Sequence, residues 1–319
     1  MKTNRSLSRR DVLAGAGAAL AAGAAAAVAA KAPPGAAKRK DEPFGYCLNT
    51  ATISGQRLGL VKEIEVVAKA GYGAIEPWVG SIRRYQQSGG SLKDLGKRIA
   101  DLGLKVPSAM GFPRWLAEDK AQRDRALEQA KGEMELVRQI GGLRISAPPV
   151  GARRGSAVDL LAAAERLRGL LEVGETVGVV PQLEIWGTSP VLSRIGQAAM
   201  VAIETGHPKA CLLLDVYHIY KGGSSFTGLK LLSAEAMHVL HLNDYPADPP
   251  RESIRDQHRV YPGDGVAPLK EILRTLKGIG FRGWLSLELF NRDYHRRPAL
   301  EVARTGLAKM RAAVRAALA

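Results

Sequence analysis

The chain has 319 residues, of which 46% are hydrophobic and 24% are charged, and its formal net charge is +15. These values are ordinary for a globular protein, and the length allows one large domain or two small ones. Residues 1–40 hold eight Lys or Arg and a single acidic residue, which leaves 38 basic and 30 acidic residues in the remainder, a net charge of +8. This moderate charge suits anionic ligands but does not identify a nucleic-acid partner.

The N-terminal segment is typical of an export signal. Leu-Ser-Arg-Arg-Asp-Val at 7–12 precedes an Ala/Gly-rich run at 13–30, and the adjacent Arg9 and Arg10 resemble a twin-arginine signal. A transmembrane anchor is the alternative, but Ala and Gly bury little apolar area per residue. We expect a signal at 1–32, a disordered linker at 33–42 and a periplasmic or extracytoplasmic domain at 43–319. No second long apolar segment follows, so we expect no stable membrane insertion once the signal is removed.

Eight short apolar segments predict strands that alternate with helices. The strands are expected at residues 44–49, 74–78, 105–110, 143–147, 179–186, 211–215, 238–241 and 284–289. The helices are expected at residues 56–70, 91–102, 120–140, 156–177, 193–205, 268–277 and 298–318. Strict alternation favours a parallel sheet covered by helices, and eight units favour a closed (β/α)8 TIM barrel. An open doubly wound sheet is the alternative, but no Gly-x-Gly-x-x-Gly turn follows the first strand.

The two cysteines, Cys47 and Cys211, both lie inside predicted strands. A pair in an exported protein could form a disulfide. Buried strand cysteines more often act as small hydrophobic residues, so we expect free thiols.

Four residues of metal-ligand type stand at the ends of the last four predicted strands: Glu184, Asp215, His241 and Glu288. An unpaired charge at each buried strand end would cost several kcal/mol, on the order of the usual penalty for burying a polar group. A divalent cation between three carboxylates and one imidazole removes this cost and leaves positions for substrate oxygens. Such an oxygen-rich set suits Mn²⁺ or Mg²⁺, with Co²⁺ or Zn²⁺ as alternatives. Separate salt bridges or helix caps are the competing interpretation.

At these residues the chain resembles the xylose-isomerase-like TIM-barrel superfamily, which contains sugar isomerases and epimerases and the endonuclease-IV-type AP endonucleases. The resemblance covers roughly residues 43–315. It lies in Gln-Leu-Glu (182–184), Leu-Asp-Val-Tyr-His (214–218), His-Leu-Asn-Asp (241–244), Asp-Gln-His-Arg-Val-Tyr-Pro-Gly-Asp-Gly (256–265) and Leu-Glu-Leu (287–289). The resemblance implies that Glu184, Asp215, His241 and Glu288 bind one metal ion. It also implies that Glu184 and Glu288 are the catalytic acid and base, which move a proton beside a sugar carbonyl through an enediolate.

Six further residues are candidates for substrate binding. His218 resembles the relatives' histidine that hydrogen-bonds a substrate hydroxyl. Arg259 is suited to an oxyanion, and aromatic faces can stack on sugars. Each also has a structural interpretation. His218 could cap a loop, and His258 with Arg259 could be a solvated pair of loop charges. Glu76 could form an ion pair with a neighbouring strand, and the two tryptophans could simply pack at the rim. The candidates are His218, His258, Arg259, Glu76, Trp115 and Trp186.

The function expected from this pattern is a metal-dependent isomerase or epimerase of a sugar or keto-sugar. A keto-sugar or inosose-type dehydratase or lyase is the first alternative, because it uses the same metal and the same base. An AP endonuclease needs additional histidines near strands two and three, yet no histidine occurs before His207. A non-catalytic sugar-binding barrel is a further alternative, although both glutamates are present. The expected partner is a small sugar, and a homodimer or tetramer is left open.

Overall fold

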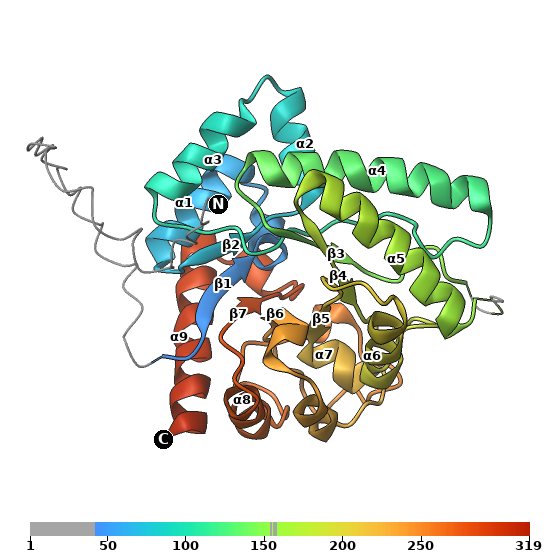
Figure 1. Ribbon diagram of the computed structural model, residues 1–319. Coiled ribbons are helices and arrows are strands. Elements are labelled where there is room, and N and C mark those ends of the chain that lie inside the picture. The colour runs from blue at the N-terminus through green and yellow to red at the C-terminus, as the bar shows by residue number, and fades with distance from the viewer. Residues whose placement is uncertain (1–41, 154, 156–157) are drawn as a thin grey trace, which may run out of the picture. The chain divides into compact units, whose positions relative to one another are not determined.

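Figure 1 shows the computed structural model, which describes residues 42–319 except 154, 156 and 157. The described residues belong to one compact unit. The predicted export signal at 1–32, and the predicted linker up to residue 41, lie outside the described residues.

Seven parallel strands form one sheet in the order β2-β1-β7-β6-β5-β4-β3 (Figure 1). They correspond to seven of the eight predicted strands, with ends that differ from the prediction by one or two residues. The strands are β1 (Gly45–Asn49), β2 (Ala74–Glu76), β3 (Arg144–Ala147), β4 (Val180–Glu184), β5 (Leu212–Asp215), β6 (Met237–His241) and β7 (Trp284–Leu287).

The remaining predicted strand, at 105–110, lies between β2 and β3 but is not a regular strand. Isolated parallel bridges join this segment to both neighbours and complete the barrel. Pro107 stands in its middle and has no N–H to donate to a ladder, which accounts for the interrupted pairing. The expected (β/α)8 barrel is therefore present, with the irregular segment 105–110 in the position of one strand. The bridges are Ala74–Lys105, Trp78–Met110 and Ala109–Ile145.

Helices cover the outside of the sheet (Figure 1). The α-helices are α1 (Leu60–Ala70), α2 (Val79–Gln87), α3 (Leu92–Asp101), α4 (Lys120–Gln139), α5 (Leu160–Val177), α6 (Ile195–Glu204), α7 (Val216–Lys221), α8 (Leu269–Gly278) and α9 (Ala299–Leu318). The 3-10 helices are η1 (Thr50–Gln56), η2 (Phe226–Leu231), η3 (Ala234–Ala236), η4 (Asp256–His258) and η5 (Tyr294–Arg296).

All seven predicted helices are present, and two of them begin four residues later than predicted. The helix expected from residue 56 begins at Leu60, because residues up to Gln56 form the 3-10 helix η1. The helix expected from residue 156 begins at Leu160, where the Asp159 side chain accepts a hydrogen bond from the backbone N–H of Ala162.

Two short helices, α2 and α7, were not predicted, because each begins directly after a strand end and offers little periodic pattern. Asp215 ends β5 and is also the N-cap of α7, where its side chain accepts from the backbone N–H of His218. This cap fixes the backbone at the point where the predicted metal ligand leaves the strand.

Cys47 and Cys211 are buried free thiols, as predicted. Among the described residues, no helix is both long enough and apolar enough to cross a membrane.

Candidate active site

The four predicted ligand residues lie together at the carboxyl ends of the strands. Glu184, Asp215 and His241 are the last residues of β4, β5 and β6, and Glu288 directly follows β7. The ladder pairs Asp215 with His241, and His241 with Ser286, so these ends stand at one level of the sheet. All four ligand-type side chains are at most 2% exposed. In a barrel, this end of the strands is where active sites are found.

Three of these residues form a compact group. One ligand atom from each of Asp215, His241 and Glu288 lies within 4.8 Å of the others. His241 Nδ1 is 3.3 Å from Glu288 Oε2 and 3.5 Å from Asp215 Oδ2. Glu184 lies outside this group but lines the same cavity as Glu288. The predicted set of four is thus three clustered residues with Glu184 beside them.

Glu76 fixes the orientation of His241. The Oε2 atom of Glu76 is 3.0 Å from His241 Nε2, and it also accepts hydrogen bonds from Ser286 Oγ at 2.7 Å and Asn49 Nδ2 at 3.0 Å. A carboxylate behind a metal-binding histidine sets the ring orientation and raises its basicity. Glu76 is fully buried and does not line the cavity. Its placement matches the ion-pair interpretation and corrects the expected substrate contact.

Within the predicted ligand set, two buried polar atoms have no hydrogen-bond partner among the described residues: His241 Nδ1 and Glu184 Oε2. An unsatisfied buried polar atom costs on the order of 1–3 kcal/mol. Both atoms could instead ligate a cation, and the full set of one imidazole nitrogen and carboxylate oxygens suits a divalent ion. The residues present therefore fit the metal ion that the sequence predicted.

Arg259 supplies positive charge to the same carboxylates. Its Nη1 lies 2.9 Å from both Asp215 Oδ2 and Glu288 Oε2, and its Nη2 lies 2.5 Å from Asp256 Oδ1. Burial opposes the charge of Arg259, but Asp215, Asp256 and Glu288 together raise its pKa above the ordinary value. The guanidinium is 1% exposed, so this compensation takes place away from water.

Two carboxyl groups of the site differ in acidity. Burial raises the pKa of Glu184 to about 8; His241 opposes this shift, while the negative charges of Glu288 and Asp215 add to it. Burial also opposes ionisation of Asp215, but Arg259 and His241 hold the pKa of Asp215 below its ordinary value. Charged neighbours, and not burial alone, therefore separate the pKa values of these two buried carboxyl groups.

His218 faces the cavity in its neutral form. Burial, with the positive charge of Arg259, lowers the pKa of His218 to about 4. Its Nδ1 accepts a hydrogen bond from the backbone N–H of Gly187 at 3.2 Å, and its Nε2 lies 3.1 Å from Arg259 Nη2. Of the six predicted substrate-binding residues, three line the cavity: His218, Arg259 and Trp186.

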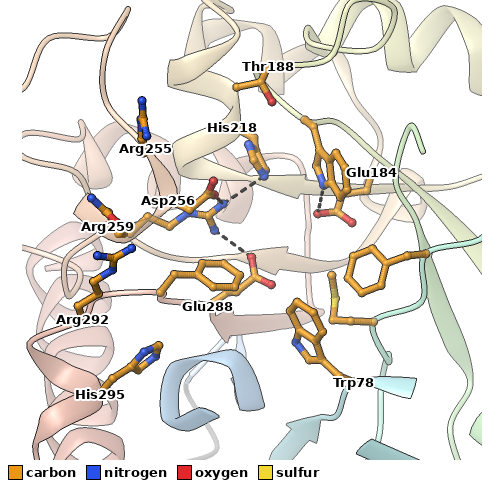
Figure 2. Close-up of a pocket in the computed structure, with 15 residues that line it drawn as sticks. Trp78, Glu184, Thr188, His218, Arg255, Asp256, Arg259, Glu288, Arg292 and His295 are labelled. Carbon is orange, nitrogen blue, oxygen red and sulfur yellow. Dashed lines mark hydrogen bonds and ion pairs between the residues drawn. The ribbon is translucent and has the colours of Figure 1, made fainter. Parts of the chain in front are cut away.

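The cavity has a volume of about 770 Å³ and opens above the carboxylates (Figure 2). Four aromatic rings of its wall are in contact in series: Phe290 with Trp78, Trp78 with Phe112, and Phe112 with Trp186, at centroid distances of 6.3, 4.9 and 6.3 Å. Sugars bind such aromatic faces alongside a few polar groups. The lining residues are Trp78, Met110, Phe112, Glu184, Trp186, Thr188, His218, Arg255, Asp256, Gln257, Arg259, Glu288, Phe290, Arg292 and His295.

Two sequence predictions of substrate contact are not supported by the structure. Trp115 is 1% exposed, its indole N–H donates to Pro148 O at 2.6 Å, and it does not line the cavity. His258 also lies outside the lining, with its Nδ1 accepting from the backbone N–H of Arg255 at 3.0 Å. Both side chains instead make hydrogen bonds to nearby backbone atoms.

Sequence reasoning missed Asn49 and Trp78. Trp78 Nε1 donates to Asn49 Oδ1 at 3.0 Å, and Asn49 Nδ2 lies 3.2 Å from Glu288 Oε1. Asn49 ends β1 and Trp78 follows β2, so their positions at strand ends were the available signal. Phe112, Phe290, Arg255 and Arg292 lie in loops, where no comparable pattern marks a site residue.

Comparisons with known proteins agree with this geometry. The sequence profile of the family described as "Xylose isomerase-like TIM barrel" matches residues 64–313. The inosose isomerase of Bacillus licheniformis is 29% identical over 267 residues, which cover 81% of this chain and 94% of that protein. The 3-dehydroshikimate dehydratase of Pseudomonas aeruginosa is 27% identical over 267 residues, which cover 81% of this chain but 40% of that protein. A crystal structure of IOLI protein with a zinc atom has a TM-score of 0.78 and 25% identity, covering 85% of this chain and 98% of that one.

Proposed function

The chain belongs to the xylose isomerase-like TIM barrel family, and on that premise we propose that it is a divalent-metal-dependent isomerase or epimerase of a sugar or keto-sugar. The observation that supports this most directly is the placement of Glu184 and Glu288. Both carboxyl groups line one cavity, beside the group formed by Asp215, His241 and Glu288. The metal is proposed to be held by Glu184, Asp215, His241 and Glu288, with Mn²⁺ or Mg²⁺ preferred.

The residues of the site account for proton movement beside a carbonyl. One glutamate removes a proton from the carbon next to the carbonyl, and the other returns a proton to the carbon skeleton. Arg259 and neutral His218 border the space above the carboxylates, where they can donate hydrogen bonds to substrate oxygens. When bound, the divalent cation supplies electrophilic stabilisation of the negative charge that develops on the carbonyl oxygen. The aromatic wall shields the reacting carbon from water.

A dehydratase is the second candidate function. The observation that favours it is the similarity to a 3-dehydroshikimate dehydratase over 81% of this chain. Removal of a proton beside a carbonyl, followed by loss of a β-hydroxyl group as water, would use the same two glutamates. Product analysis distinguishes the two functions, because isomerisation conserves substrate mass and dehydration removes one water.

Metal binding is the first test of the proposal. We expect one divalent ion per chain, measured by elemental analysis after loading with Mn²⁺, Mg²⁺, Co²⁺ or Zn²⁺ separately. The Asp215→Asn variant removes a ligand charge and should lose the ion. Two or three zinc ions per chain would favour endonuclease-like chemistry instead. No stoichiometric metal under any loading condition would contradict the proposed mechanism.

Turnover is tested with inosose in D₂O. We expect deuterium at the carbon beside the carbonyl in the parent protein, detected by mass spectrometry. Glu184→Gln and Glu288→Gln should each abolish incorporation. Glu63→Gln is the matched control, because Glu63 is a buried glutamate of α1 outside the cavity. Incorporation that survives both active-site changes would rule out the glutamate pair.

We also propose that the protein is exported by the twin-arginine route and acts outside the cytoplasm. The support is the sequence at 7–30, with Arg9 and Arg10 before a weak apolar run. Replacing both arginines by lysine should retain the full-length protein in the cytoplasm of a bacterial host, whereas the parent reaches the periplasm. An unchanged distribution in fractionated cells would contradict export by this route.

A further inference from the structure

We propose that Trp186 is a positioning residue for Glu184. This inference rests on the proposed function of the site. The indole N–H of Trp186 holds one carboxyl oxygen of Glu184 and thereby leaves the other oxygen free to ligate the metal or exchange a proton. The sequence suggested Trp186 only as a wall against which a sugar could stack.

The geometry of Glu184 supports this role. Trp186 Nε1 donates to Glu184 Oε1 at 3.1 Å, whereas Oε2 is buried without a hydrogen-bond partner. Glu184 is 1% exposed, so its carboxyl group is largely shielded from bulk solvent. In Figure 2 a dashed line marks the indole hydrogen bond at the carboxyl group of Glu184. One fixed oxygen therefore defines where the second one points.

Glu288 is held differently, which makes the indole contact specific to Glu184. Arg259 Nη1 lies 2.9 Å from Glu288 Oε2, and Asn49 Nδ2 lies 3.2 Å from Glu288 Oε1. Both oxygens of Glu288 have partners, one of them a cation. Among the contacts of the described residues, Trp186 is the hydrogen-bond donor of Glu184.

The loop after β4 fixes Trp186 in turn. The backbone N–H of Trp186 donates to Leu192 O at 3.1 Å, and its carbonyl accepts from Ser189 N at 2.8 Å. The next residue, Gly187, packs against α7 so closely that a Cβ atom would lie 2.6 Å from the backbone N of Gly222. A rigid loop that carries the donor suits a positioning role, because the indole cannot follow a displaced carboxyl group.

The indole of Trp78 reaches Glu288 indirectly, through the side chain of Asn49. Trp78 Nε1 donates to Asn49 Oδ1, and Asn49 in turn contacts Glu288. Trp78 and Trp186 both form part of the cavity wall. They differ in that Trp186 bonds its glutamate directly, whereas Trp78 acts through Asn49. Loss of the Trp186 donor should therefore have the larger effect on the metal.

The test replaces Trp186 with Phe, which keeps an aromatic wall and removes the donor. Co²⁺ is the probe, with affinity measured by chelator competition and ligand geometry by visible absorption. We expect Trp186→Phe to bind Co²⁺ about 10–100-fold more weakly than the parent, as for other residues that support metal ligands, and with an altered spectrum. With inosose, kcat should fall by a similar factor while KM changes little, since the wall is retained.

Trp115→Phe is the control, because the Trp115 indole donates to Pro148 O outside the cavity. It should match the parent in Co²⁺ affinity and spectrum. A Trp186→Phe variant with the Co²⁺ affinity and spectrum of the parent would overturn the inference. An equal loss of Co²⁺ affinity in Trp78→Phe would also overturn it, because it would indicate a general disturbance of the aromatic wall. Failure of the parent itself to bind Co²⁺ would instead contradict the proposed function.

Discussion

Two arcs of the barrel differ in regularity and in what they contribute to the mouth. The arc from β4 to β7 is joined by parallel ladders, with one register shift between β5 and β6, and carries Glu184, Asp215, His241 and Glu288. The arc from β2 through 105–110 to β3 is joined by isolated bridges and contributes the aromatic rings of Trp78 and Phe112. Ligand atoms must be held to within a fraction of an ångström, whereas an aromatic wall tolerates some displacement.

The arcs also differ in how buried charge is compensated. Asp215 and Glu288 share the guanidinium of Arg259, and His241 is paired with Glu76. On the opposite side, the buried Glu133 is paired with Arg83, which is itself 43% exposed. Charge in the catalytic arc is therefore compensated by buried partners, one of them Glu76 of β2, whereas the charge of Glu133 is compensated by a partly exposed arginine.

Arg259→Gln should have the largest effect on stability. It leaves Asp215 and Glu288 buried without their cation, which typically costs about 3–5 kcal/mol. We expect a loss of this size by urea unfolding in the presence of a chelator, and a smaller loss with Co²⁺, because a divalent ion also compensates the carboxylates. Arg292→Gln, at an exposed arginine of the same cavity, should stay within about 0.5 kcal/mol of the parent. Equal losses in the two variants would show that the loss does not depend on the buried pairs of Arg259 with Asp215 and Glu288.

Glu76→Gln should weaken metal binding without disrupting the fold. The amide keeps the shape of the side chain but loses the negative charge behind His241, and such changes cost about 10–100-fold in metal affinity. Competition with a chelator measures the change for Co²⁺. Glu133→Gln alters a buried glutamate of the irregular arc and should leave Co²⁺ affinity as it is in the parent. A reduced affinity in both variants would show that the loss does not depend on the contact with His241.

Glu63→Gln should stabilise the protein above neutral pH. Burial raises the pKa of Glu63 to about 7, with Arg84 opposing the shift. The folded state therefore binds the proton more tightly than the unfolded state, and the stability from protonation is present below about pH 4.3 and lost as the pH rises through 7. Glutamine does not ionise and so does not lose this stability. The free energy of unfolding of the variant should therefore exceed that of the parent by on the order of 2 kcal/mol at pH 8. A difference that does not depend on pH would contradict ionisation as the cause.

Pro107→Ala should have the smallest effect. Replacing proline raises the entropy of the unfolded chain and costs about 0.4–1 kcal/mol. If Pro107 alone causes the interrupted pairing of 105–110, the new N–H should become protected in hydrogen exchange. An amide at 107 that exchanges as fast as an exposed loop would show that the irregularity has another cause.

The sequence by itself was sufficient for the barrel and for the position of its candidate metal ligands. Apolar runs that end in Glu184, Asp215, His241 and Glu288 mark both the strands and their carboxyl ends, because a parallel strand buried on both faces is apolar up to the residue that leaves the sheet. The helices between them follow from their periodicity. The irregular segment at 105–110 was still predicted as a strand, because an apolar run does not show whether its backbone N–H groups find hydrogen-bond partners.

Only the tertiary structure decided what each polar residue touches. Glu76 pairs with His241, 165 positions away in the chain, and Arg259 reaches Asp215 across 44 positions. Trp115 and Trp186 have the same side chain, yet one indole donates to Pro148 O and the other to Glu184. A side chain's type fixes what it can donate or accept, and a strand's pattern fixes where it ends. The partner depends on long-range packing, because direction and distance arise only when the strands and loops close around one another.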